Sequence, residues 1–170
     1  MKKKPNYLIQ ILVTLSILCA SNTAFAGDID TNEKIRSLDD PRVPSRYLPL
    51  EKMNISDYVG YSFVDRTSVK LHPYNPLIRT YVRIINYSRA LSQDKEDSEQ
   101  GFSYRSQVIH EYVNCDKKEY ARGLIQFYEN YFGEGQLEDS NNTPKRLIAT
   151  FPKTKARQNL QVICSLPLNN

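Results

Sequence analysis

Hydrophobic and polar residues alternate over much of the chain from residue 58 onward, which is the pattern of strands that bury one face. We predict strands at residues 58–64, 78–87, 104–115 and 119–131, and a short one at 146–151. These segments are rich in tyrosine, valine and isoleucine, which favour strands because their side chains fit a pleated, half-buried surface. The pattern therefore predicts a β-sheet that takes up most of the chain.

The connections between these segments are short or charged. Residues 65–68 and 116–118 are predicted as turns, and residues 72–76 as a loop, because two prolines there withhold backbone donors. Residues 92–101 carry many charges and have nothing to bury, so we interpret them as a solvated hairpin loop. Gly133-Glu134-Gly135 indicates a further turn. Consecutive strands with such connections predict an antiparallel meander.

One helix is predicted near the C-terminus. Thr154 is a suitable N-cap for a helix that begins at Lys155. Four of its apolar residues share one stripe: Ala156, Leu160, Ile163 and Cys164. This stripe needs an apolar partner, so we expect the helix to pack on one face of the sheet.

The first 26 residues are typical of a cleaved signal peptide. Three lysines precede an apolar run, which is shorter than the ~20 residues of a spanning helix, and Ala24-Phe25-Ala26 is a small-x-small cleavage site. Cys19 lies inside this segment after Leu18, where lipid-modification sites normally have a small residue, so we expect cleavage without lipidation. The mature chain would then have no transmembrane segment and would reside in the periplasm or at the cell surface.

Removing this segment leaves 170 − 26 = 144 residues, a length that suits one domain. We expect a flexible lead-in at residues 27–50, which are acidic and proline-rich, and a folded domain at residues 51–168. The removed segment contains three of the 23 basic residues and none of the 19 acidic ones, so the net charge falls from +4 to 20 − 19 = +1. A nucleic-acid partner is therefore not expected.

Cys115 and Cys164 are the two cysteines of the mature chain. An even pair in an exported protein predicts a disulfide, and closing a 49-residue separation would stabilise the fold by ~4 kcal/mol. The fold class is therefore α+β, an antiparallel sheet of five or six strands with a C-terminal helix packed on one face and tethered by this disulfide.

Catalysis is not expected from these residues. The chain has two histidines without metal-ligand spacing, no C-x-x-C pair and no phosphate-binding glycine loop, so we predict neither an enzyme nor a metal site.

The chain has twelve tyrosines, which suit either ordinary strand pairing or a binding surface. Strict alternation places Tyr104, Tyr112, Tyr120 and Tyr128 on the face opposite the helix, where with Leu124 they would form a partner or dimer surface. The residues alone leave both interpretations open.

Three blocks of sequence resemble the bacterial surface-adhesin protein E family: Asn114-Cys115, Phe132-Gly133-Glu134-Gly135 and Gln161-Val162-Ile163-Cys164. Their order and spacing match over roughly residues 78–166. The resemblance implies an antiparallel sheet with a disulfide-tethered helix.

The resemblance also implies a function, namely a Gram-negative envelope adhesin that binds host matrix or plasma proteins such as vitronectin and laminin. Family members can be dimers, so a homodimer is a further expectation. The implied binding stretch is residues 104–122, and its candidate contact residues are Tyr104, Arg105, Tyr112, Lys117, Lys118, Tyr120 and Arg122. Haem is a ligand reported in the family, and His72 would be the candidate residue for it, although no cofactor is otherwise expected.

The binding stretch has fewer basic residues than an electrostatic adhesin is expected to have. The alternative is therefore a periplasmic protein that maintains the envelope and has no host ligand, as in the related CNP1-like envelope proteins.

Overall fold

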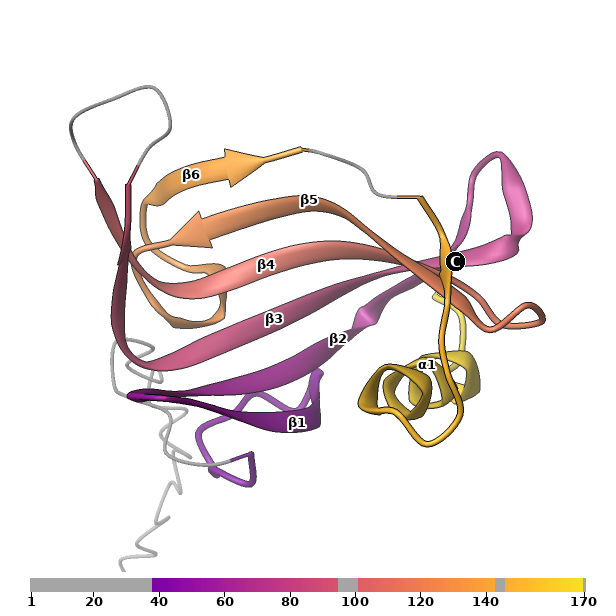
Figure 1. The fold of residues 1–170 in the computed structure, drawn as a ribbon, viewed down its shortest axis with the longest axis horizontal. Helices are drawn as coiled ribbons and strands as arrows, with labels where there is room; N and C mark the ends of the chain where they lie inside the picture. Colours follow the sequence, from indigo (N-terminus) through magenta and orange to yellow (C-terminus); the bar gives the residue numbers. More distant parts are fainter. Residues whose placement is uncertain (1–37, 95–100, 143–145, 170) are drawn as a thin grey trace, which may run out of the picture.

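The computed structural model describes residues 38–94, 101–142 and 146–169. These residues form one antiparallel sheet with the strand order β1-β2-β3-β4-β5-β6, a short strand β7 that pairs with β5, and one C-terminal helix (Figure 1). The elements are β1 Tyr47–Ile55, β2 Tyr58–His72, β3 Asn75–Gln93, β4 Phe102–Asn114, β5 Glu119–Tyr128, the 3-10 turn η1 Tyr131–Gly133, β6 Leu137–Asn141, β7 Ile148–Ala149 and α1 Lys155–Ser165. The α+β class and the meander are confirmed.

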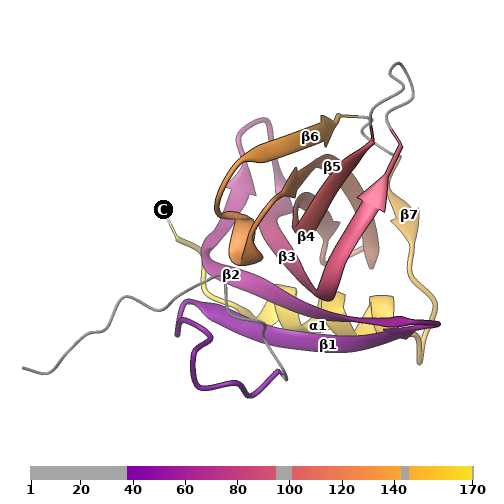
Figure 2. The same ribbon diagram turned by 90° about the vertical axis from the view of Figure 1, so that its left-hand side faces the viewer.

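The sheet is strongly curved rather than flat. Figure 2 shows β1 and β2 along one side of the molecule, β3 to β5 rising from them, and β6 at the far side. Register shifts occur in the pairing of every consecutive pair from β1–β2 to β5–β6. Such irregularities increase local twist and bend strands, which accounts for the curvature.

The first strand begins within the range that the sequence assigns to a lead-in. β1 starts at Tyr47, whose ring is 4% exposed and stacks on Phe132 with ring centroids 4.8 Å apart. The pairing of β1 with β2 shifts between Pro49 and Glu51, so alternation is broken there. The ordered domain therefore begins before residue 51, whereas residues 1–26 lie outside the described residues.

The predicted turn at residues 65–68 is wrong, because β2 continues through it as a bulge. Pairing with β3 passes from Asp65↔Val82 to Lys70↔Thr80. The Ser68 hydroxyl accepts the backbone N–H of Val82 at 2.8 Å, so a side chain replaces the ladder bond that the bulge interrupts. β2 then runs on to His72, and the predicted loop at 72–76 shrinks to a two-residue turn.

Paired residues share a face, so the register divides the sheet into two surfaces. Face A carries Val64, Arg83 and Ile109, which lie opposite one another on β2, β3 and β4, and face B carries Phe63 and Ile84. Two buried clusters include face A residues, and a third includes Phe63 and Ile84 of face B.

The turn η1 contributes to the cluster on face B. Asn86 accepts the N–H of Phe132 at 2.9 Å, and Ser106 accepts the N–H of Gly133 at 3.0 Å. Gly133 has φ +76°, a conformation that glycine adopts without steric cost, so the predicted glycine turn is confirmed. The Phe132 ring is thereby held 5.5 Å from that of Phe63.

The helix begins at the predicted residue. Thr154 accepts the N–H of Arg157 at 3.2 Å as its N-cap. Leu160 and Ile163 lie in the same buried cluster as Val64, Val69, Tyr81 and Val113 of the strands. No helix among the described residues is long and apolar enough to cross a membrane.

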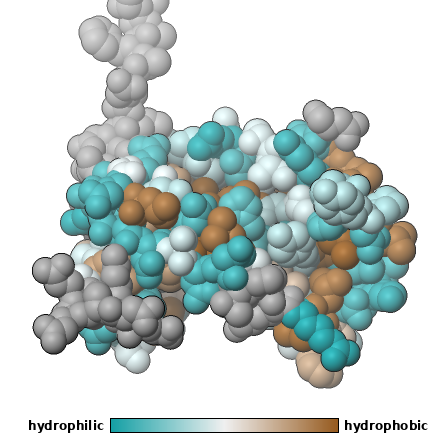
Figure 3. All heavy atoms as spheres, turned by 90° about the horizontal axis from the view of Figure 1, so that it is seen from above, coloured by the Kyte–Doolittle hydropathy of each residue, from teal (hydrophilic) through white to brown (hydrophobic). Residues whose placement is uncertain are grey.

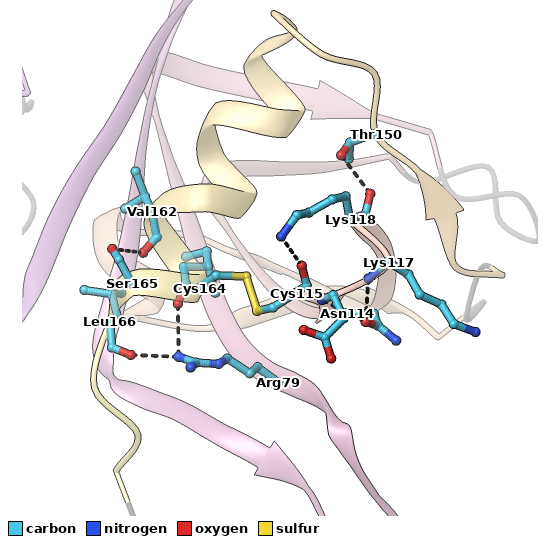
Figure 4. The surroundings of a disulfide bond; sticks show 12 residues. Arg79, Asn114, Cys115, Lys117, Lys118, Thr150, Val162, Cys164, Ser165 and Leu166 are labelled. Carbon is cyan, nitrogen blue, oxygen red and sulfur yellow. Dashed lines mark hydrogen bonds between the residues drawn. A yellow bond between two sulfur atoms is a disulfide. The ribbon is translucent and has the colours of Figure 1, made fainter.

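The predicted disulfide is present between Cys115 and Cys164 (Figure 4). It joins the end of α1 to the turn after β4. Arg79 of β3 adds a second tie, because its guanidinium donates to the carbonyl of Leu166 at 2.7 Å. The C-terminal segment is therefore held to the sheet at two neighbouring points.

Candidate partner-binding surface

The predicted contact residue Tyr104 is buried. It is 7% exposed, and its ring packs edge-to-face against Phe127 and Tyr87 at centroid distances of 4.9 and 5.7 Å. Burial raises the pKa of the Tyr104 hydroxyl. Alternation does not reveal this position because the β3–β4 register shifts between Asn86↔Ser106 and Leu91↔Tyr104.

Tyr120 and Arg122 lie on the other face from Tyr112 and Tyr128. Ile125 pairs with Ile109 but Arg122 pairs with Glu111, so two residues of β5 stand opposite His110. This bulge turns the first part of β5 over by one residue. Tyr120 and Arg122 therefore join face A, and the four tyrosines expected on one face do not form a common surface.

Arg105 and Tyr112 are half-buried, and neither side chain is on the β4–β5 turn. Arg105 reaches the carbonyl of Glu129 at 3.4 Å. The Tyr112 ring lies 5.9 Å from the ring of His72. Tyr112 is near the turn along β4, since it pairs with Ala121, but its side chain is on face B, whereas Arg105 lies toward the other end of β4.

Lys117 and Lys118 are exposed on the β4–β5 turn, next to the disulfide (Figure 4). The Asn114 side chain shapes this turn by accepting the N–H groups of Asp116 and Lys117 at 3.1 and 3.0 Å. Thr150 donates its N–H to the Lys118 carbonyl at 2.8 Å, which ties the turn to the segment after β7. Two cations are therefore held on a turn fixed by hydrogen bonds and a disulfide.

A groove of about 190 Å³ lies beside this turn, between β5 and β7. Arg122 and Arg146 line it with Tyr120, Ala121 and Ile148, and Ile148 is 52% exposed. We define the β5 edge surface by these residues and the two lysines: Lys117, Lys118, Tyr120, Ala121, Arg122, Arg146 and Ile148. Sequence reasoning missed Arg146 and Ile148, which it placed in a strand without a binding role.

A buried ionic network lies next to the β5 edge surface on face A. The Glu111 carboxylate accepts hydrogen bonds from Arg83 at 2.7 Å and from the Tyr81 hydroxyl at 2.5 Å. Arg122 lies 3.5 Å from the same carboxylate, and Glu51 lies 3.7 Å from the Arg83 guanidinium. Burial, reinforced by Glu111, raises the pKa of Tyr81 well above its ordinary value. Burial alone would lower the pKa of Arg83, but Glu111 beside it raises that pKa instead. The network thus fixes one end of Arg122 while its side chain stays 43% exposed.

The two histidines line one pocket of about 420 Å³, which also includes Lys70 and Tyr112. His72 accepts the N–H of Tyr74 through Nδ1 at 3.3 Å. Within the described parts of the chain, no group of three or more His, Cys, Asp or Glu could hold a metal ion. Haem binding by His72 stays a prediction.

Comparison with known proteins assigns the chain to a family. The surface-adhesin protein E family matches residues 47–165. The chain belongs to this family. No significant match exists among curated protein sequences.

Solved structures of adhesin E proteins share the fold. Haemophilus influenzae protein E is 21% identical, with a TM-score of 0.54, over 72% of this chain and 86% of its own. Its crystal form II gives 21% identity and a TM-score of 0.55 over 78% and 96%. A structure from non-typeable Haemophilus influenzae gives 20% and 0.54 over 78% and 83%.

Two of the three sequence blocks that resemble adhesin E proteins meet at the disulfide. Asn114 ends β4 and Cys115 begins the turn after it, and the block ending at Cys164 lies in the last part of α1. The third block, Phe132–Gly135, forms η1 and the residues after it. These three blocks thus consist of residues that shape the fold, and they do not include the cations of the β5 edge surface.

Proposed function

We propose that this member of the adhesin E family is an exported envelope adhesin that binds a host extracellular-matrix or plasma protein of the vitronectin or laminin type. The β5 edge surface is its binding site, and the protein has no enzymatic activity. The observation that supports this proposal is that Arg122 and Arg146 line one groove with the exposed Ile148, while two further exposed cations, Lys117 and Lys118, lie on the turn that leads into β5.

The chemistry of this surface fits an acidic segment of a partner protein. Exposed Lys and Arg side chains steer an acidic partner and set the orientation of binding. Tyr120 and Ile148 supply apolar contact area beside them, and Arg122 presents a planar guanidinium that can bind a carboxylate with two hydrogen bonds. Tyr104 has no direct role in this proposal because it is buried.

The test is binding to immobilised vitronectin and laminin, measured by biolayer interferometry at low and physiological salt. The double variant Lys117→Ala/Lys118→Ala should weaken binding by about tenfold at low salt and less at high salt, because exposed charges are screened. The matched control, Lys52→Ala/Arg66→Ala, removes two exposed cations from β1 and β2 and should bind normally. Unchanged binding by the folded double variant would refute the site.

Cellular location needs a separate test, because host proteins reach only surface-exposed domains. Protease treatment of intact cells should digest the domain, whereas a periplasmic protein of the CNP1-like type would be digested only after permeabilisation. Protection on intact cells would contradict the adhesin proposal. The homodimer stays a prediction that sedimentation velocity would test.

A further inference from the structure

The tip of the β2–β3 hairpin exposes an unusual amount of apolar surface. Tyr74 is 91% exposed, Leu77 58% and Leu71 43%, and Pro73 and Pro76 beside them are also exposed. Figure 1 shows this hairpin projecting from one end of the sheet, and Figure 3 shows hydrophobic residues on the surface at that end. These side chains stand on a protruding turn, so they contribute little to the cores of the domain.

The end of the hairpin near the tip is also positively charged. From Arg66 to Arg79 the chain contains three arginine or lysine residues and no aspartate or glutamate. Lys70 is the exposed cation nearest to the tip, two residues before His72. An apolar tip with cations behind it and no acidic residue favours an anionic partner.

The pocket of about 420 Å³ lies directly behind this tip on the side of face B. Lys70 pairs with Thr80, and Thr80 pairs with Tyr112, so these three side chains form one row across β2, β3 and β4. His72 and His110 also line the pocket. Among the described residues, neither Lys70 nor His110 has a side-chain hydrogen bond or ion pair.

The donors of this pocket suit a phosphate group. Lys70 offers an ammonium group, Thr80 and Tyr112 offer hydroxyls, and His72 offers its Nε2–H because its Nδ1 already accepts from Tyr74. The acidic residue of the lining, Glu111, has its carboxylate bound to Arg83 and Tyr81 on face A. The pocket therefore presents donors to an entering group.

We propose that the β2–β3 hairpin docks this protein on an anionic phospholipid surface, with Tyr74, Leu77 and Leu71 in the interfacial layer and a headgroup phosphate in the pocket of Lys70, His72 and His110. Tyrosine is a residue that settles at membrane interfaces, because its ring is apolar and its hydroxyl is polar. A lipid surface also accepts a protruding apolar turn, whereas protein interfaces place their anchors in fitted pockets. This docking is independent of host-protein binding.

The test is flotation of the chain from residue 27 with vesicles of phosphatidylcholine alone and of phosphatidylcholine with phosphatidylglycerol. The unmodified protein should float with the vesicles that contain phosphatidylglycerol and should not bind those of phosphatidylcholine alone. Leu77→Asp should weaken binding by about tenfold, because a leucine side chain that the lipid layer would bury is replaced by a charge. Lys70→Glu should abolish the preference for phosphatidylglycerol.

Leu137→Asp is the matched control. Leu137 is 45% exposed at the start of β6, where it pairs with Tyr128 at the C-terminal end of β5. It should bind vesicles normally. Equal binding to both vesicle types, no binding to either, or unchanged binding by Leu77→Asp would overturn the proposal. Loss of vitronectin or laminin binding in Leu77→Asp without any vesicle binding would instead assign the hairpin to a protein interface. Because Leu77 lies outside the β5 edge surface, the two proposals can fail separately.

Discussion

The buried ion pair between Arg83 and Glu111 allows a quantitative test of the network on face A. Their side chains are only 8% and 3% exposed, and Glu111 holds both Arg83 and the Tyr81 hydroxyl. Glu111→Gln keeps the shape of the side chain but removes its charge. Arg83 then keeps one carboxylate partner in this network, Glu51 at 3.7 Å, with a side chain that is 14% exposed.

Removing one partner of a buried pair usually costs 3–5 kcal/mol, since the other charge stays buried without compensation. Glu51 compensates in part, so we expect the free energy of unfolding to fall by about 3 kcal/mol. Urea unfolding followed by far-UV circular dichroism would measure it. The control is Arg122→Gln, because Arg122 lies 3.5 Å from the same carboxylate but is 43% exposed, and its loss should cost no more than about 1 kcal/mol.

The double variant Arg83→Met/Glu111→Leu separates the two contributions. Replacing both charges by apolar side chains removes the uncompensated charge but leaves the buried Tyr81 hydroxyl without its acceptor, so the double variant should be about 1–2 kcal/mol less stable than the unmodified protein. The reasoning would be refuted if Glu111→Gln cost less than about 1 kcal/mol, or if the double variant were less stable than Glu111→Gln.

Two further predictions concern the disulfide and the buried tyrosines. Cys115→Ser/Cys164→Ser should lower the free energy of unfolding by about 4 kcal/mol, because the unfolded chain regains the freedom of a 49-residue loop; equal melting temperatures for this variant and the oxidised protein would contradict this. Burial raises the pKa of Tyr87 well above its ordinary value, so its contribution to stability is complete below pH about 10 and is lost as the pH rises toward the folded-state pKa. Tyr87→Phe should therefore show a smaller loss of stability between about pH 9 and 11 in urea titrations, and an unchanged slope would argue against this origin.

Much of the fold follows from local sequence patterns. Alternation locates the four longer strands β2 to β5, Thr154 marks the helix start, and Gly133 marks a turn with positive φ. β1 escapes notice because it contains Pro49 and a register shift, which remove the period of two. β6 is also missed, because Leu137–Asn141 is mostly polar, so the sequence shows the central strands but neither these two nor the irregular pairing.

The same limit explains the errors in the candidate site. Alternation assigns faces correctly only until a bulge, and the one opposite His110 moves Tyr120 and Arg122 to face A. The exposure of Lys117 and Lys118 was predictable because charged residues on a tight turn remain in water. The exposure of Tyr74 and Leu77 was not, because apolar residues carry no local signal that distinguishes a core from an interaction surface.

The Cys115–Cys164 bond also has a mechanical consequence. If the protein is pulled from its two ends, the 49-residue separation between the cysteines cannot extend while the bond is intact. At about 3.5 Å per residue, roughly 170 Å of contour length is withheld from the unfolding chain. The bond thus limits how far the chain can be extended by force. Under a reducing agent, the fully extended chain would be longer by that amount.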